Sequence, residues 1–185
     1  LFLVTLLLFS CFSILRSVWF DAPFVPTGRK DTQSILKLAQ LKPGEVVYDL
    51  GSGDGRLVRA SARQGARAVG VEKLWVLVLW SRLVWWICTR CQSIATHWAP
   101  QCVAMANTHN GDGTATFKSI NFFKQDLRDA DVIFCYLLPK AMENLKTKFE
   151  KELRPGTRVI SRAFSIHGWT PTQTVRFRKY SPPVY

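Results

Sequence analysis

Acidic residues are scarce in this chain of 185 residues, which has 13 Asp and Glu against 25 Lys and Arg and a formal net charge of +12. Such a charge suggests a nucleic acid as partner, but the chain lacks a run of Lys or Arg with interleaved aromatic residues. The basic bias is strongest in residues 140–185, and an anionic membrane surface is the simplest partner for it. A solvated surface without a partner is the alternative. We therefore expect no nucleic-acid partner.

Convincing metal-binding patterns are also absent. Cys88 and Cys91, with His97 and Cys102 nearby, could be drawn as a zinc site. The first two, however, fall at the end of an apolar helical stretch, whereas zinc ligand pairs usually lie on turns. Residues 110–113 have too few carboxylates for a calcium loop. We predict no metal, and we expect the five cysteines, an odd number, to be reduced thiols.

Charge is missing altogether from Leu1 to Leu15, and the aromatic pair Trp19 and Phe20 follows. This pattern predicts a membrane-anchor helix over residues 1–20, with an aromatic belt at the interface. A cleaved signal peptide is the alternative, although no small-x-small pattern precedes Asp21. Because the chain does not begin with Met, we expect residues upstream. The basic residues after the anchor predict, by the positive-inside rule, that the following domain faces the cytoplasm or, in a mitochondrion, the matrix.

The rest of the chain reads as a linker, 21–30, and one domain, 31–185, of a length that fits a single core. Apolar strand patterns alternate with helical ones, which predicts an α/β fold with a Rossmann-like, doubly wound and mostly parallel sheet. Residues 92–114 read as a surface insert. The predicted strands cover 45–50, 67–72, 115–120, 131–137 and 157–163, with an incomplete terminal strand near 173–180, and the helices cover 31–40, 56–64, 73–90 and 140–153.

Three alternating glycines follow the first of these strands. Gly51, Gly53 and Gly55 come directly after Asp49 and Leu50, and a helical stretch follows them. Glycines let a backbone approach a ligand without a Cβ in the way, and the free N–H groups at a helix start favour electron-rich ligand groups. The loop therefore predicts a ligand site, with a glycine-rich turn that binds nothing as the alternative.

The second strand ends at Glu72, 21 positions after Gly51, where such folds place a carboxylate on ribose hydroxyls. The glycine spacing is not the G-x-G-x-x-G that dinucleotide sites prefer, and Asp49 would repel a pyrophosphate. The same carboxylate suits the ammonium of an amino acid. S-adenosyl-L-methionine has that ammonium, a ribose and no phosphate, so we predict it as the cofactor and disfavour a nicotinamide-dependent oxidoreductase.

The stretch from Asp49 to Arg56 resembles motif I of class I S-adenosylmethionine-dependent methyltransferases. Further segments are similar to those of the small membrane-anchored protein-lysine methyltransferases that modify the adenine nucleotide translocase and the ATP synthase c-ring protein in mitochondria, and of their bacterial relatives. The resemblance covers roughly Pro23 to Trp169. These segments are Pro23–Thr27, Leu41–Gly44, Gly70–Glu72, Ser81-Arg82, Tyr136–Pro139, Glu152–Gly156 and Val159–Ser161.

The resemblance implies roles for residues outside the glycine loop. Methyltransferases commonly place an acid after the third strand, near the adenine; here Asn121 stands there and can accept a hydrogen bond from the adenine amine. Tyr136 would position the acceptor, in an apolar pocket with Trp169 that favours a neutral lysine. The predicted cofactor-binding residues are Thr27, Asp49, Gly51, Ser52, Gly53, Asp54, Gly55, Glu72, Asn121 and Phe122, whose ring would cover the adenine.

We therefore predict a membrane-bound enzyme that methylates a lysine of a small, membrane-embedded protein. A methyltransferase for a small molecule or lipid is the first alternative, and a non-catalytic membrane scaffold with a vestigial cofactor fold is the second. The helix over 73–90 has four tryptophans among aliphatic residues. It suggests a second contact with the bilayer or with a membrane substrate, and ordinary core packing is the other interpretation.

Overall fold

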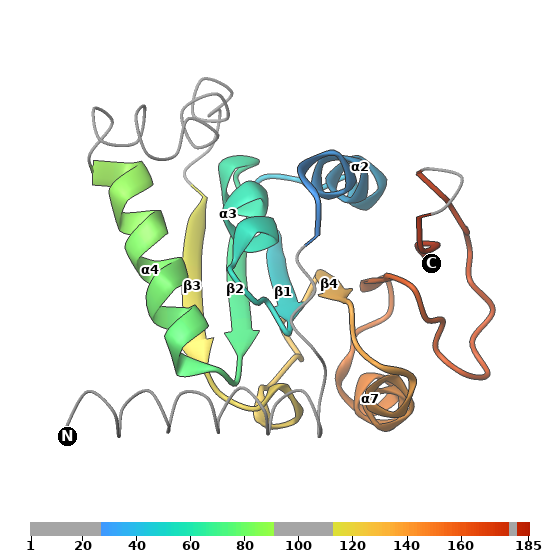
Figure 1. Ribbon diagram of the computed structural model, residues 1–185. Coiled ribbons are helices and arrows are strands. Elements are labelled where there is room, and N and C mark those ends of the chain that lie inside the picture. The colour runs from blue at the N-terminus through green and yellow to red at the C-terminus, as the bar shows by residue number, and fades with distance from the viewer. Residues whose placement is uncertain (1–26, 91–112, 178–180) are drawn as a thin grey trace.

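A parallel sheet of five strands lies at the centre of the computed structural model, which describes residues 27–90, 113–177 and 181–185 (Figure 1). The strand order is β3-β2-β1-β4-β5, and every neighbouring pair runs parallel. The first strand of the chain thus lies in the middle of the sheet. The chain adds β2 and β3 on one side of it and β4 and β5 on the other, and this switch between β1 and β4 opens a crevice at the carboxyl ends of these strands. The strands are β1 (Val46–Leu50), β2 (Arg67–Glu72), β3 (Thr114–Ser119), β4 (Val132–Cys135) and β5 (Arg158–Ser161).

Helices cover both faces of the sheet, because alternate residues of the central strands point to opposite sides. Val47 and Phe134 belong to one core, with the buried residues of three helices; Leu50 and Ile133 belong to a second core on the other face. Figure 1 shows the resulting three layers. The first face carries α2 (Arg29–Ala39), α3 (Arg56–Arg63) and α4 (Trp75–Arg90), and the second carries the 3-10 helix η1 (Phe122–Lys124) and α7 (Pro139–Glu152).

The predicted α/β fold with a Rossmann-like parallel sheet is confirmed, with small shifts at the element ends. The helix predicted from residue 31 begins at Arg29, and β4 ends before Tyr136. The terminal strand predicted near 173–180 does not form within the described residues. Val184 instead makes isolated antiparallel bridges with Val175 and Arg162.

The structure tests the predictions about the membrane and the cysteines only in part. None of the helices in residues 27–90, 113–177 and 181–185 has the length and apolar character needed to cross a bilayer. The predicted anchor over 1–20 lies outside the described residues, as do most of the insert and three of the proposed zinc ligands. Cys88 is disulfide-bonded and Cys135 is a buried free thiol. The expectation of reduced thiols is wrong for Cys88, because an odd number of cysteines requires only one of them to be unpaired.

Gly70 shows how closely the glycine loop packs on the sheet. It pairs with Asp49 across β1 and β2, and a Cβ there would lie 2.8 Å from Ser52 Oγ and 2.9 Å from Val58 Cγ2. We expect Gly70→Ala to lower the free energy of unfolding by about 1–3 kcal/mol, the usual cost of overpacking, in urea denaturation. Gly28→Ala is the matched control, since its Cβ would meet only an Asp31 oxygen at 3.9 Å. Equal stability of the two variants would contradict this packing.

Candidate active site

The loop after β1 folds back over the carboxyl end of β2. The backbone N–H groups of Gly51 and Ser52 both donate to the carbonyl of Val71, at 2.8 and 3.1 Å. Gly55 then starts α3 with φ of 71°, in the left-handed region. A Cβ at this position would collide with the Phe117 ring and lie 2.9 Å from Ser81 Oγ. The loop therefore needs glycine here both for its backbone angles and for space.

Helix α4 supports the same loop from the side. Ser81 is fully buried, and its hydroxyl donates to the carbonyl of Gly53 at 3.3 Å. The Arg82 guanidinium donates twice to the carbonyl of Phe117 in β3, at 3.2 and 2.6 Å. The sequence indicates Ser81 and Arg82 only through the family resemblance. Their contacts show that they fix α4 against the loop and the sheet.

Three carboxylates gather at this loop. Glu72 accepts from the backbone N–H of Gly53 at 3.0 Å and from that of Leu74 at 3.0 Å. Asp54 forms an ion pair with the Arg56 guanidinium at 2.5 Å. Asp49 is only 8% exposed, and no residue in the described part of the chain hydrogen-bonds its carboxylate.

Burial, followed by the negative charges of Glu72 and Asp54, raises the pKa of Asp49 to about 7. A carboxylate that lies beside two others without a cation of its own is costly to ionise. A positively charged ligand group at this edge of the sheet would remove that cost. The loop is therefore built for a cation rather than for a phosphate.

Thr27, the first described residue, comes to the same loop. Its carbonyl accepts from Arg56 Nη1 at 2.5 Å, while the rest of that guanidinium binds Asp54. The contact explains why the segment before α2 lies near the glycine loop although it is far from it in sequence. The role of Thr27 in binding the cofactor stays a prediction.

Asn121 and Phe122 lie after β3, beside the end of β2, where the Ile120 N–H donates to the Glu72 carbonyl at 3.1 Å. Asn121 Oδ1 accepts from the backbone N–H of Phe123 at 3.0 Å and so caps η1. The Phe122 ring is 8% exposed and belongs to the core under α7. Both residues are near the predicted adenine site and already make structural contacts; their adenine contacts stay predictions.

Tyr136 follows β4 at the same carboxyl edge, and its ring faces Arg162 with 5.0 Å between the guanidinium carbon and the ring centroid. Arg162 forms an ion pair with Asp31 of α2 at 2.7 Å, and both side chains are nearly buried, at 11% and 8% exposure. Its backbone N–H also donates to the Cys135 carbonyl at 2.9 Å. Sequence reasoning missed Arg162 and Asp31, because their contact joins residues 131 positions apart.

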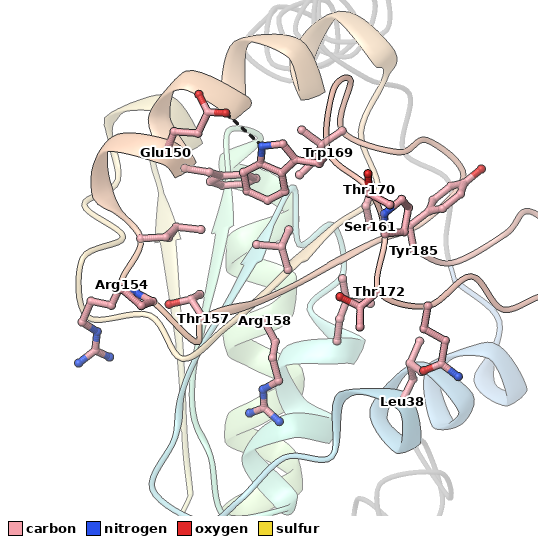
Figure 2. A pocket seen from close by; sticks show the side chains of 18 of the residues that line it. Leu38, Glu150, Arg154, Thr157, Arg158, Ser161, Trp169, Thr170, Thr172 and Tyr185 are labelled. Atoms are coloured by element: carbon pink, nitrogen blue, oxygen red, sulfur yellow. Dashed lines mark hydrogen bonds between the residues drawn. The ribbon is translucent and has the colours of Figure 1, made fainter.

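A cleft of about 770 Å³ is lined by residues of β5, of the end of α7 and of 169–173. Figure 2 shows the side chains that line it. Trp169 lines it, and the indole Nε1–H donates to Glu150 of α7 at 3.1 Å. The glycine loop and its carboxylates do not line this cleft. The predicted pocket shared by Tyr136 and Trp169 is therefore wrong for Trp169, whose ring packs against Phe149 instead, with 6.3 Å between centroids.

Comparison with known proteins gives the class and then the family. The model of the ANTKMT methyltransferase domain matches residues 49–173. A protein-lysine N-methyltransferase of Saccharolobus islandicus is 34% identical over 156 residues, which cover 83% of this chain and 84% of that protein. The Mus musculus lysine N-methyltransferase named for the ATP synthase c-ring protein is 32% identical over 152 residues; the match covers 82% of this chain but only 53% of the mouse protein.

A solved methyltransferase structure is also similar to this chain. The RNA methyltransferase of Salinibacter ruber, in complex with S-adenosyl-L-homocysteine, is 33% identical, with a TM-score of 0.68, and the match covers 87% of this chain and 91% of that one. The fold and the site thus define a class I, S-adenosylmethionine-dependent methyltransferase. Within that class, the chain belongs to the ANTKMT methyltransferase family. The predicted family, enzyme class and cofactor are confirmed.

The residues at the loop fit this cofactor. S-adenosylmethionine supplies a methyl group on a positively charged sulfonium, and it also carries an ammonium. Asp49, buried with no hydrogen bond to its carboxylate in the described chain and with its pKa raised, would be stabilised as a carboxylate by such charges. Glu72, at the end of β2, retains acceptor capacity beyond its two backbone bonds and would hold the ribose hydroxyls.

Cofactor affinity should depend on pH through Asp49. Its pKa in the unliganded protein is about 7, so the carboxyl is mostly neutral at pH 5.5 and must release its proton when the cation binds. We expect the affinity for S-adenosylmethionine to rise roughly twentyfold from pH 5.5 to 7.5 in titration calorimetry, with a plateau above. The stability of the unliganded protein depends on pH in the opposite direction. Because the pKa of Asp49 in the folded chain lies above its ordinary 3.8, the free energy of unfolding falls as the pH rises from about 4 to about 7.

Asp49→Asn is the control for this titration, because it keeps the shape and removes the ionisation. The variant should bind the cofactor weakly at every pH and show little dependence on pH. An unchanged pH profile in Asp49→Asn would show that another group is responsible.

Proposed function

We propose that this methyltransferase acts on the side-chain amine of a lysine in a small, membrane-embedded protein. The observation that carries the proposal is the 34% identity to a protein-lysine N-methyltransferase over 84% of that protein's length. Further relatives are named for two acceptors, the ATP synthase c-ring protein and the adenine nucleotide translocase, at 32% identity each. This chain spans only 53% and 58% of those two mouse proteins, so the acceptor is the proposed part.

Methyl transfer to an amine asks little acid-base chemistry of the protein. The lysine must be neutral when it attacks, and its ordinary pKa is about 10.4. Removal of the amine from water favours the neutral form, and an apolar pocket beside the Tyr136 ring would provide it; the Arg162 guanidinium over that ring is paired with Asp31 and leaves little net charge. Positioning then supplies most of the rate, because the amine must approach in line with the bond that breaks. Tyr136 is suited to that role, since β4 lies two strands from β2, which carries Glu72.

The membrane location belongs to the same proposal. Residues 1–20 form the anchor, α4 makes a second contact, and the methyltransferase domain faces the cytoplasm or the matrix. The support for the anchor is its uncharged sequence with an aromatic and basic flank.

A direct test is to incubate the protein with methyl-labelled S-adenosylmethionine and one acceptor at a time. The acceptors are the ATP synthase c-ring protein in proteoliposomes, the adenine nucleotide translocase in proteoliposomes, protein-free vesicles, and RNA. We expect label in a membrane protein, recovered as methyllysine after hydrolysis, and none with Asp49→Asn. Label in the lipid extract would favour the lipid alternative, and label in RNA would favour the activity named for the Salinibacter protein.

Tyr136 offers a test of the acceptor side. Tyr136→Ala should lower kcat at least about tenfold while cofactor affinity stays within about threefold, since the ring acts mainly in the transition state. Tyr136→Phe is the matched control, because it keeps a ring beneath Arg162. We expect it to retain most of the activity. A folded Ala variant with undiminished turnover would exclude a role for Tyr136, and parallel loss of cofactor binding and activity would mark it as a core residue.

A further inference from the structure

Helix α4 presents an unusual outer face. Its 16 residues include no acid, and only Val78 and Ser81 are buried. Six large apolar side chains are each 46–55% exposed, which is far more apolar surface than a soluble helix normally shows. They are Trp75, Val76, Leu79, Trp80, Leu83 and Trp86.

These six residues form one continuous stripe. At 100° per residue they fall within an arc of about 140° on the helical wheel, opposite the face that holds Val78 and Ser81. We call this surface the α4 stripe. In Figure 1, α4 runs along the outside of β3, the edge strand of the sheet. Since Val78 belongs to the core and the six stripe residues are exposed, the stripe is the side of α4 turned away from the sheet. The core therefore does not use it, and the predicted alternative of ordinary core packing holds only for the inner face.

The composition of the stripe indicates what covers it. Three of its six members are tryptophans, which favour the boundary between lipid and water. Exposed basic residues stand at its two ends, Lys73 just before α4 and Arg90 at its last position. The chain as a whole has a net charge of +12. Apolar surface between basic ends matches the acyl boundary and the headgroups of an anionic bilayer.

Helix α4 is not suited to crossing the bilayer. Sixteen residues at 1.5 Å each are shorter than the hydrocarbon core of about 30 Å. The inner face also bonds to the protein, through Ser81 to the Gly53 carbonyl and Arg82 to the Phe117 carbonyl. A helix held in this way can contribute only its outer face.

We infer that α4 is an interfacial helix, which lies in the plane of an anionic membrane with its stripe in the headgroup and acyl boundary. Because α4 begins three residues after Glu72, its first turn lies near the glycine loop, so docking brings the carboxyl edge of the sheet to the level of the headgroups. Resting on the proposed function, this places the acceptor lysine at the membrane surface, on a segment that reaches the enzyme sideways along the bilayer.

The test measures contact between the α4 stripe and lipid, in the full chain and without a methyl acceptor. The seven tryptophans are labelled with fluorine and assigned by single Trp→Phe changes, and the protein is reconstituted in nanodiscs of phosphatidylcholine and phosphatidylglycerol. Spin-labelled lipid should broaden the resonances of Trp75, Trp80 and Trp86 several-fold more than that of Trp169. The last is an internal control, since it packs against Phe149 beside the cleft at β5.

Two results would overturn the inference. One is equal broadening of the stripe resonances and Trp169. The other is protection of the stripe from both the spin-labelled lipid and an aqueous gadolinium chelate, because a protein surface, from residues 1–20 or from a second copy, would then cover it. Neither depends on which group is methylated, so failure here and failure of the proposed lysine activity are distinguishable.

A charge variant provides the second measurement. Leu79→Glu should reduce the broadening of the other stripe resonances toward the Trp169 level and leave S-adenosylmethionine affinity within about twofold. Phe164→Glu is the matched control, an exposed apolar residue outside α4, at 37% exposure, and should leave the broadening unchanged. Equal effects of the two variants would mean that general charge, rather than the stripe, governs the contact.

Discussion

A buried carboxylate without a cation beside it is the constraint on which the site depends. Asp49 is the penultimate residue of β1, in the middle of the sheet where the strand order reverses, and Glu72 is the last residue of the neighbouring strand β2. In a protein interior such a charge is tolerated only if a ligand or a proton neutralises it. The glycine loop, the capping carboxylate of Glu72 and the ion pair of Asp54 with Arg56 all serve to hold this negative edge in a fixed shape. Binding of a cationic cofactor is then favoured by relief of repulsion as well as by direct contact.

Helix α4 connects this site to the outside of the molecule. Its inner face contacts the glycine loop through Ser81 and the edge strand β3 through Arg82, so the helix cannot move without disturbing the glycine loop. Its outer face is the α4 stripe. A contact made by the stripe would therefore set the orientation of the cofactor edge as a rigid unit, with no change of fold.

The end of β4, where we propose that the acceptor binds, is held by a different set of contacts. Asp31, Arg162 and Tyr136 bring together α2, the end of β5 and the end of β4. Because the ion pair is nearly buried, loss of either partner would leave a charge unpaired, so the guanidinium is kept over the tyrosine ring. The cleft at β5 is lined by neither the glycine loop nor its carboxylates.

The sequence by itself determined the sheet, the family and the cofactor. Each depends on local patterns: strand and helix periodicities, the three glycines after Asp49, and an acid at the end of the next strand. It could not determine which side chains from distant segments meet. Arg162 and Asp31 carry no local motif, and the sequence placed Trp169 beside Tyr136, whereas packing places it against Phe149. Nor could the sequence decide which face of α4 is buried, because apolar residues surround that helix. Only the tertiary structure decided this, since burial depends on where Val78 and Ser81 meet the sheet and the loop.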